Sequence, residues 1–206
     1  MKNVLKNAVI LSILLLALTG CAAEKTTTNE APANAEPPAP PVAEVMPNEV
    51  DKEDPTLLRR PFTPEEIRDE WQAGLTITFL MKFPSREESQ RWTVKSADEE
   101  GCEIEFAVLD ENGEVVGEPN VQRSTWVELR DHANFKAESA TFRNQTRLTE
   151  LGELEGWFYE VRGDEVGIVN EYFFAKSLPG APVHMRVLKD GEIISEMIQK
   201  ERQAAP

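Results

Sequence analysis

The chain has 206 residues, 40% of them hydrophobic, and carries a formal charge of −15 at neutral pH from 22 basic and 37 acidic side chains. This length allows one ordinary domain with appendages. The excess of acid disfavours free nucleic acid and anionic lipid headgroups as partners, because like charges repel. No carboxylate cluster has a spacing typical of a metal site.

The first 20 residues have the composition of a secretory signal. Lys2 and Lys6 make the start positive, and residues 8–18 are almost wholly apolar. A permanent membrane-spanning helix needs about 20 apolar residues, so this shorter run fits the apolar part of a cleavable signal. Removal of residues 1–20 takes away two bases and no acid, which leaves 20 bases, 37 acids and a formal charge of −17.

The tetrapeptide Leu18-Thr19-Gly20-Cys21 closes this segment. It resembles the lipobox of bacterial lipoproteins, in which a branched apolar residue and two small residues precede a cysteine. The resemblance implies diacylglyceryl transfer to the sulfur of Cys21, cleavage between Gly20 and Cys21, and acylation of the new amine. Two or more acyl chains give stable membrane anchoring, whereas one chain is marginal.

The residues after the lipobox bear on the choice of membrane. In lipoproteins of bacteria with two membranes, an aspartate directly after the cysteine resembles an inner-membrane retention signal, whereas here Ala22 and Ala23 follow. The resemblance therefore implies a lipid-anchored protein of the cell envelope, on the outer membrane and facing the periplasm.

Residues 21–61 form a segment of different composition. Five prolines lie between residues 32 and 41 among alanine and glutamate, and the apolar residues show no period. Such a segment buries too little surface to offset its chain entropy, so we expect a disordered or partly polyproline tether. A second interpretation is that the proline run at residues 37–41 is a ligand for a groove-type domain.

Two short helices are predicted from their start signals. Segment 63–66 places Thr at the N-cap, Pro at the first helical position and Glu at the third, which is a capping box. This helix should run to about Ala73 and end at Gly74. Segment 125–128 repeats the capping-box pattern and predicts a second helix over residues 126–134.

Alternation of apolar and polar residues predicts the strands, most clearly at residues 75–83. The Asn112-Gly113 pair predicts a tight hairpin turn, and Gly-Asp and Asp-Gly pairs at 163–164 and 190–191 predict two more. The expected strands cover residues 75–83, 91–95, 102–108, 114–121, 139–149, 154–161, 165–175, 183–188 and 192–199.

The order of these elements predicts the fold class. No helix separates successive strands, so parallel crossover units are not supported. We predict a mainly β domain over residues 62–200, a curved antiparallel meander or half-barrel of about eight or nine strands with two short helices, followed by a disordered tail at 201–206. The arrangement is loosely similar to the half-barrel with which lipoprotein-trafficking proteins hold acyl chains, and that similarity identifies no binding residue.

Several of the later strands carry aromatic side chains on both faces, as around Phe158 and Phe173. Two interpretations remain open, a filled core and a ligand cavity inside the sheet. Four tryptophans are expected to anchor the core, namely Trp71, Trp92, Trp126 and Trp157.

Candidate catalytic residues are few. Nucleophilic catalysis usually needs an orienting base, and the two histidines, His132 and His184, are predicted at a helix end and on the polar face of a strand. Cys102 is predicted to be a buried, inert thiol. No catalytic or nucleotide-binding motif occurs. The adhesion tripeptide at residues 162–164 is interpreted as ordinary turn chemistry.

We therefore expect a non-enzymatic, lipid-anchored envelope protein that binds another envelope component, without a cofactor or a metal ion. The first alternative is a carrier of a small apolar or lipidic ligand in a cavity of the sheet. The second is a hydrolase that uses paired carboxylates, although no pair stands out in the sequence.

Overall fold

The computed structural model describes residues 49–205. The signal peptide, Cys21 and residues 22–48 of the expected tether lie outside the described residues, so the expectations for them stay predictions. Within residues 49–205, no helix is long and apolar enough to cross a membrane.

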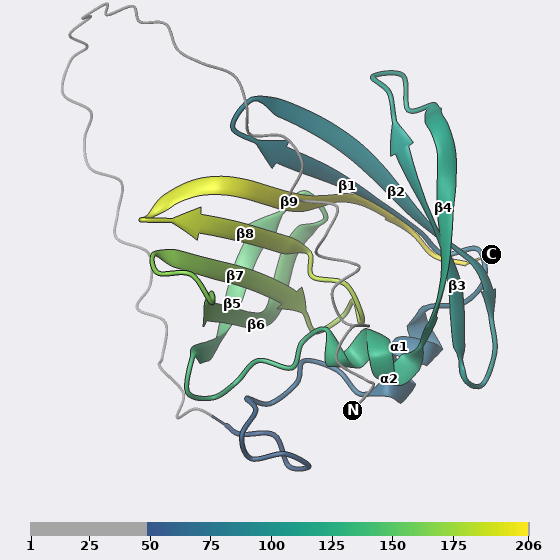
Figure 1. Cartoon of the computed structure of the whole chain (residues 1–206). Coiled ribbons are helices and arrows are strands. Elements are labelled where there is room, and N and C mark those ends of the chain that lie inside the picture. The colour runs from purple at the N-terminus through teal and green to yellow at the C-terminus, as the bar shows by residue number, and fades with distance from the viewer. Residues whose placement is uncertain (1–48, 206) are drawn as a thin grey trace, which may run out of the picture. The chain divides into compact units, whose positions relative to one another are not determined.

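Nine antiparallel strands form one sheet in the order β4-β3-β2-β1-β9-β8-β7-β6-β5 (Figure 1). Neighbours in this order are also neighbours in the chain, except for β1 and β9. The sheet thus consists of two meanders that join in its middle, which confirms the predicted mainly β class. The elements are α1 (Pro64–Glu70), β1 (Thr76–Phe83), β2 (Arg86–Ala97), β3 (Gly101–Leu109), β4 (Val115–Thr125), α2 (Trp126–Asp131), β5 (Ala140–Thr149), β6 (Gly152–Arg162), β7 (Ile168–Ala175), β8 (His184–Lys189) and β9 (Glu192–Gln203).

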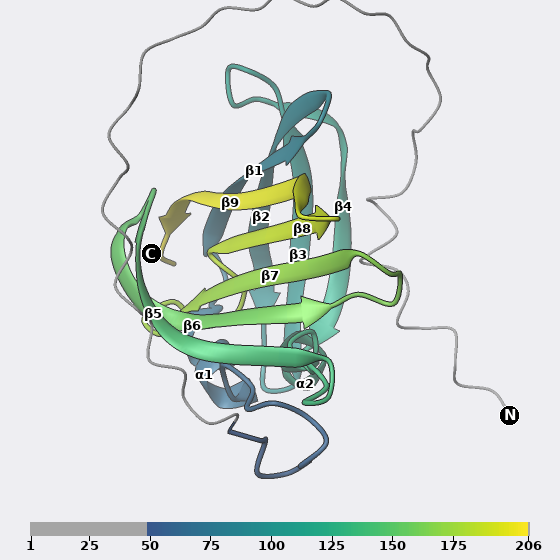
Figure 2. The ribbon, with the colours of Figure 1, turned by 90° about the vertical axis from the view of Figure 1, so that its left-hand side faces the viewer.

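The sheet is curved and open, as in a half-barrel. Figure 2 shows β6 to β9 passing across β2 to β4, with both helices at one end of the sheet. The two outermost strands, β4 and β5, do not pair with each other. Helix α2 and the loop after it connect these two strands.

Both predicted capping boxes are present. The Thr63 hydroxyl accepts a hydrogen bond from the Glu66 amide, and the Glu66 carboxylate accepts one from the Thr63 amide; Thr125 and Glu128 do the same for α2. The first helix nevertheless ends at Glu70, earlier than predicted. Trp71 leaves the helical conformation, and its indole Nε1 donates to the Pro179 carbonyl at 2.8 Å.

The concave face carries the main core. Because side chains alternate across a strand, residues in register on neighbouring strands point to the same face. Tyr159, fully buried, lies in such a row and stacks on Phe142 with ring centroids 5.6 Å apart. The row runs across six strands and consists of Phe142, Tyr159, Tyr172, Met185, Met197 and Met81.

The convex face carries a second, smaller core. Phe158 and Phe173, in register on β6 and β7, are buried there together with Ala175 and Val183. Leu151, Leu154 and Leu178 pack against this cluster. The aromatic residues on both faces of the later strands therefore fill two cores, one on each face.

The folded part begins before Phe62, the residue at which we expected it to start. Leu58 is fully buried, and the segment pairs with the chain before β5 through a bridge between Leu57 and Lys136. The guanidinium of Arg60 pairs with Asp51 at 2.9 Å. The bridge joins residues far apart in the sequence, so local composition did not reveal that this segment is folded.

The C-terminal boundary also differs from the prediction of a tail at residues 201–206. Strand β9 continues to Gln203, and the side chain of Arg202, only 6% exposed, pairs with Glu70 of α1 at 2.9 Å. This buried ion pair fixes α1 to the end of β9.

The tryptophan prediction is confirmed in part. Trp71 and Trp126 are buried in the main core, whereas Trp92 and Trp157 are half-buried and pack against it. Cys102 is fully buried, and burial raises the pKa of its thiol to about 11. The thiol is therefore protonated at neutral pH, which agrees with the expected inert role.

Candidate functional site

A charged cluster on the convex face contains His184. The histidine Nε2 lies 2.8 Å from Glu196 Oε1, and the same oxygen accepts from Arg186 Nε at 3.0 Å. We expected His184 on the surface, but its side chain is only 18% exposed. The structure brings it to Glu196 because β8 and β9 form a hairpin, a contact that the sequence pattern alone did not indicate.

The electrostatics of this cluster are those of a structural network. Burial lowers the pKa of His184, against the opposing effect of the Glu196 carboxylate. Burial opposes ionisation of Glu196 too, but hydrogen bonds from His184 and Arg186 keep its pKa below the ordinary value. Neutral His184 and ionised Glu196 are therefore the stable forms near neutral pH.

The same cluster extends across four strands as a ladder of alternating charge. Glu171, Arg186, Glu196 and Lys82 lie in register on β7, β8, β9 and β1. Arg186 reaches Glu171 at 3.7 Å and Lys82 reaches Glu196 at 3.5 Å. Opposite charges directly across strands stabilise a sheet, so pairing accounts for these groups without catalysis.

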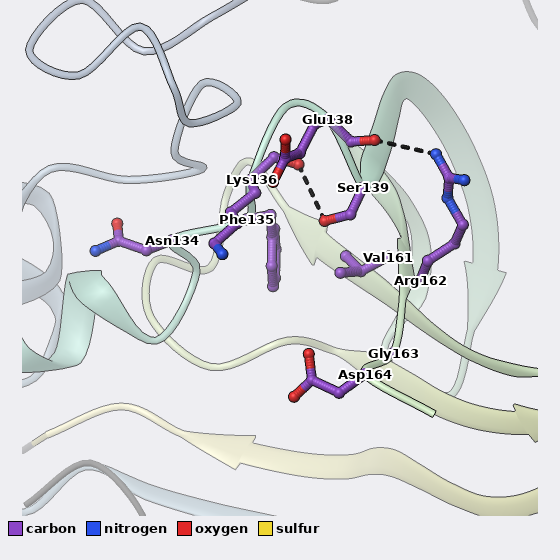
Figure 3. A pocket seen from close by; sticks show the side chains of 9 residues that line it. All are labelled: Asn134, Phe135, Lys136, Glu138, Ser139, Val161, Arg162, Gly163 and Asp164. Carbon is purple, nitrogen blue, oxygen red and sulfur yellow. Dashed lines mark hydrogen bonds between the residues drawn. The ribbon is translucent and has the colours of Figure 1, made fainter. Parts of the chain in front are cut away.

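A pocket lies where the loop before β5 meets the turn between β6 and β7 (Figure 3). Arg162 is exposed, but its guanidinium is not free, because it donates to the Glu138 carbonyl at 3.0 Å. Asp164 lies on the opposite side of the pocket from Glu138 and Ser139. The pocket is open and largely polar, which is unlike the enclosed apolar clefts that hold small ligands.

Neither histidine is placed with a nucleophile in the structure. His132 is exposed at the C-terminal end of α2, as predicted, with its Nδ1 3.3 Å from the Leu129 carbonyl oxygen. Among residues 49–205, no three or more His, Cys, Asp or Glu side chains gather so that they could hold a metal ion.

The tip of the β3–β4 hairpin carries exposed apolar side chains on both of its faces, because successive residues of a strand point to opposite sides. Val108 pairs with Val116 across the two strands, and Leu109 pairs with Val115. Val108 is 40% and Val116 is 55% exposed. Figure 1 places this tip at the end of the hairpin away from the helices. Val108 and Val116 share one face, and we call this exposed pair the valine patch.

The β5 edge carries a second unusual surface. Arg143 and Arg147 lie over the ring of Phe158, with their guanidinium carbons 4.3 and 4.4 Å from its centroid. Sequence analysis missed both surfaces. The alternation of Arg143, Gln145 and Arg147 was visible, but the position of β4 and β5 at the sheet edges follows only from the strand order.

No protein-family model and no curated protein matches this sequence. Among solved structures, MucB is similar with a TM-score of 0.48 and 13% identity over 68% of this chain and 57% of MucB. The Pseudomonas aeruginosa MucA/MucB complex gives 0.47 and 11% over 69% and 56%. A protein with YmcC-like fold from Bacteroides fragilis NCTC 9343 gives 0.40 and 10% over 70% and 99%. The chain thus spans little more than half of MucB, and these likenesses concern the arrangement of strands, not residues or activity.

Proposed function

We propose that this chain is a lipoprotein of the cell envelope, held on the outer membrane by lipid on Cys21, whose β domain is a non-enzymatic module that binds another envelope protein. The lipobox resemblance of Leu18-Thr19-Gly20-Cys21 supports the anchor. The valine patch is the observation that carries the binding role.

The valine patch is a good candidate for a protein contact because its two side chains are neighbours on one face and both are exposed. Singly exposed apolar residues are normal on a soluble protein, whereas contiguous ones mark interaction surfaces. Acidic residues lie close to the two valines in the chain, namely Asp110, Glu111, Glu114 and Glu118. An apolar centre with a polar rim is the usual anatomy of a protein interface.

The partner contacts this patch through side chains rather than by extending the sheet. Strand β4 contains Pro119, which has no N–H to donate, and Gly117 at φ +77 beside an irregularity in the β3–β4 register. Proline and bulges at an edge strand hinder the addition of another strand.

The anchor is tested by replacing the lipidated cysteine. Cys21→Ser removes the sulfur that receives the diacylglyceryl group, so the variant should appear as a soluble or uncleaved form after fractionation of cells. A Cys102→Ser variant is the matched control and should stay with the membrane. Equal membrane partition of Cys21→Ser and the unmodified chain would contradict the anchor.

The binding role is tested by photo-crosslinking from the patch in intact cells. A crosslinking residue at position 116 should capture one discrete envelope protein, and the same residue at position 166 should not. Val166 is fully exposed but lies alone in the β6–β7 turn. Identical crosslinking from both positions would show that exposure alone, and not the patch, determines the contact.

A carrier of an apolar ligand is the second candidate. Met81, Trp92 and Phe106 on the concave face are only half-buried, and the indole Nε1 of Trp92 has no hydrogen-bond partner among the described residues. Native mass spectrometry with lipid extraction of the purified full chain tests it. A bound apolar molecule would favour the carrier, and an empty folded protein would favour the protein-binding module.

A further inference from the structure

The outer edge of β5 is open and regular. All ten residues of this strand pair with β6 without a register shift, and within residues 49–205 no strand pairs with the other side of β5. In contrast to β4, the strand contains no proline or glycine. An edge of this kind is a ready template for an added strand.

The backbone groups of alternate residues point to this open edge. The Arg162 amide donates to the Ser139 carbonyl, so residue 139 faces β6. Since the two sides alternate along an antiparallel strand, the odd-numbered residues of β5 face β6 and the even-numbered residues face outward. Asn144 and Thr146 therefore present N–H and C=O groups at the centre of the open edge.

Two arginines stand beside this edge on the convex face. The guanidinium of Arg143 lies over Phe158, and that of Arg147 lies over both Phe158 and Phe173, the latter at 5.3 Å. Stacking of this kind holds a guanidinium flat on a ring and leaves its N–H groups available at the rim. Both side chains are half-buried, so their positions are defined by packing.

The positive charge of this pair is not compensated locally. Within residues 49–205, neither arginine forms an ion pair, although the protein as a whole has a large excess of acid. Burial and the neighbouring guanidiniums of Arg186 and Arg143 lower the pKa of Arg147. The carboxylate that most favours its charge, Glu171, pairs with Arg186.

Between the two arginines lies an acceptor without a donor. The side-chain oxygen Oε1 of Gln145 is buried and has no hydrogen-bond partner among the described residues. Gln145 shares the convex face with Arg143 and Arg147, because the three alternate along the strand. A buried acceptor left unpaired carries the desolvation penalty of that atom, so a donor that reached it would remove the penalty.

We propose that the β5 edge binds an extended acidic polypeptide segment of another protein, which adds to the sheet as an antiparallel strand. Its backbone pairs with Asn144 and Thr146. Two of its acidic side chains, four residues apart, meet Arg143 and Arg147, and the residue midway between them donates to Gln145. Addition of a strand at a sheet edge, with alternate side chains giving specificity, is a general mode of peptide recognition. The site lies on the opposite sheet edge from the valine patch, so the two proposals stand or fall separately.

A synthetic peptide with the core Glu-Val-Ser-Val-Glu places its two acids and its donor on one face of a strand and is the probe. Binding to the purified full chain is followed by fluorescence anisotropy of the labelled peptide. We expect saturable binding that weakens about tenfold in Arg143→Ala and in Arg147→Ala, since each variant loses a charge-assisted hydrogen bond to the peptide. Arg68→Ala, which removes an exposed guanidinium on α1, is the control and should bind normally.

Two further measurements separate strand addition from simple charge attraction. A Lys-Val-Ser-Val-Lys peptide should not bind, and Thr146→Pro, which removes an outward N–H but keeps both arginines, should weaken binding at least tenfold. Circular dichroism of each variant verifies that the sheet is intact. Unchanged binding in the folded Thr146→Pro variant would overturn strand addition. Arginine-dependent binding to vesicles of anionic phospholipid, without binding of the acidic peptide, would overturn the proposal as a whole.

Discussion

The two edge strands of the sheet, β4 and β5, differ in the surface that they offer to another protein. Both leave one side of a strand unpaired. Strand β4 carries a glycine at positive φ, a proline and a register shift, and exposes valines at its tip. Strand β5 keeps a regular ladder and places two stacked arginines beside its open side. The first edge is therefore suited to contact through apolar side chains, and the second to pairing through its backbone.

The largest expected effect on stability comes from a glycine in β6, next to the β5 edge, compared with a glycine in β4. A Cβ on Gly156 in β6 would lie 2.2 Å from the Phe174 carbonyl oxygen and 2.7 Å from the Phe173 ring. Gly156→Ala should therefore lower the free energy of unfolding by about 2–3 kcal/mol. A Cβ on Gly117 would have no atom within 4 Å. Gly117→Ala should therefore lower the free energy of unfolding by only about 1 kcal/mol, because alanine disfavours a φ of +77. Urea unfolding measures both, and equal losses would remove the contrast.

A smaller effect is expected from the arginine that covers the convex core. Arg147→Ala removes packing from Phe158 and Phe173 and should lower the free energy of unfolding by about 1 kcal/mol. Arg123 on β4 forms an exposed ion pair with Asp98, so Arg123→Ala should leave stability nearly unchanged. A loss of unfolding free energy that is larger for Arg123→Ala than for Arg147→Ala would contradict the greater structural role assigned to Arg147.

The smallest effect concerns pH. The pKa of His184 lies below 6.5 in the folded protein, so the unfolded chain binds the proton more readily. The contribution of this group to stability is therefore full above pH 6.5 and is lost as the pH falls through the folded pKa. Below pH 6.5, the unfolding free energy measured by urea unfolding should decline less steeply in His184→Gln than in the unmodified chain. An equally steep decline in both would contradict this expectation.

Local patterns were sufficient for the elements of this fold. The capping boxes at 63–66 and 125–128 predicted both helix starts, because each box closes within four residues. Alternation predicted β1, and the turn at Asn112-Gly113 predicted the β3–β4 hairpin. The mainly β class with about nine strands is confirmed by the structure.

Contacts between distant segments were beyond these patterns. The segment that contains Leu58 pairs with the chain at Lys136, and Arg202 is buried in an ion pair with Glu70 of α1. The candidate surfaces were hidden for the same reason. An exposed valine or an unpaired arginine has meaning only when the strand order shows which strands stand at the edges.

The pairing of β1 with β9 bears on how the domain assembles. Thr76 and Gln203 are partners in this pairing, so the central joint connects the first residue of the nine-stranded sheet with its last. Contacts of such high sequence separation form slowly, because the chain loses the entropy of loop closure before these contacts stabilise it. The joint has no partner strand until β9 has emerged from the ribosome or the translocation channel. Until β9 pairs with β1, the core of each meander is incomplete. The chain is most susceptible to proteolysis and aggregation during this interval.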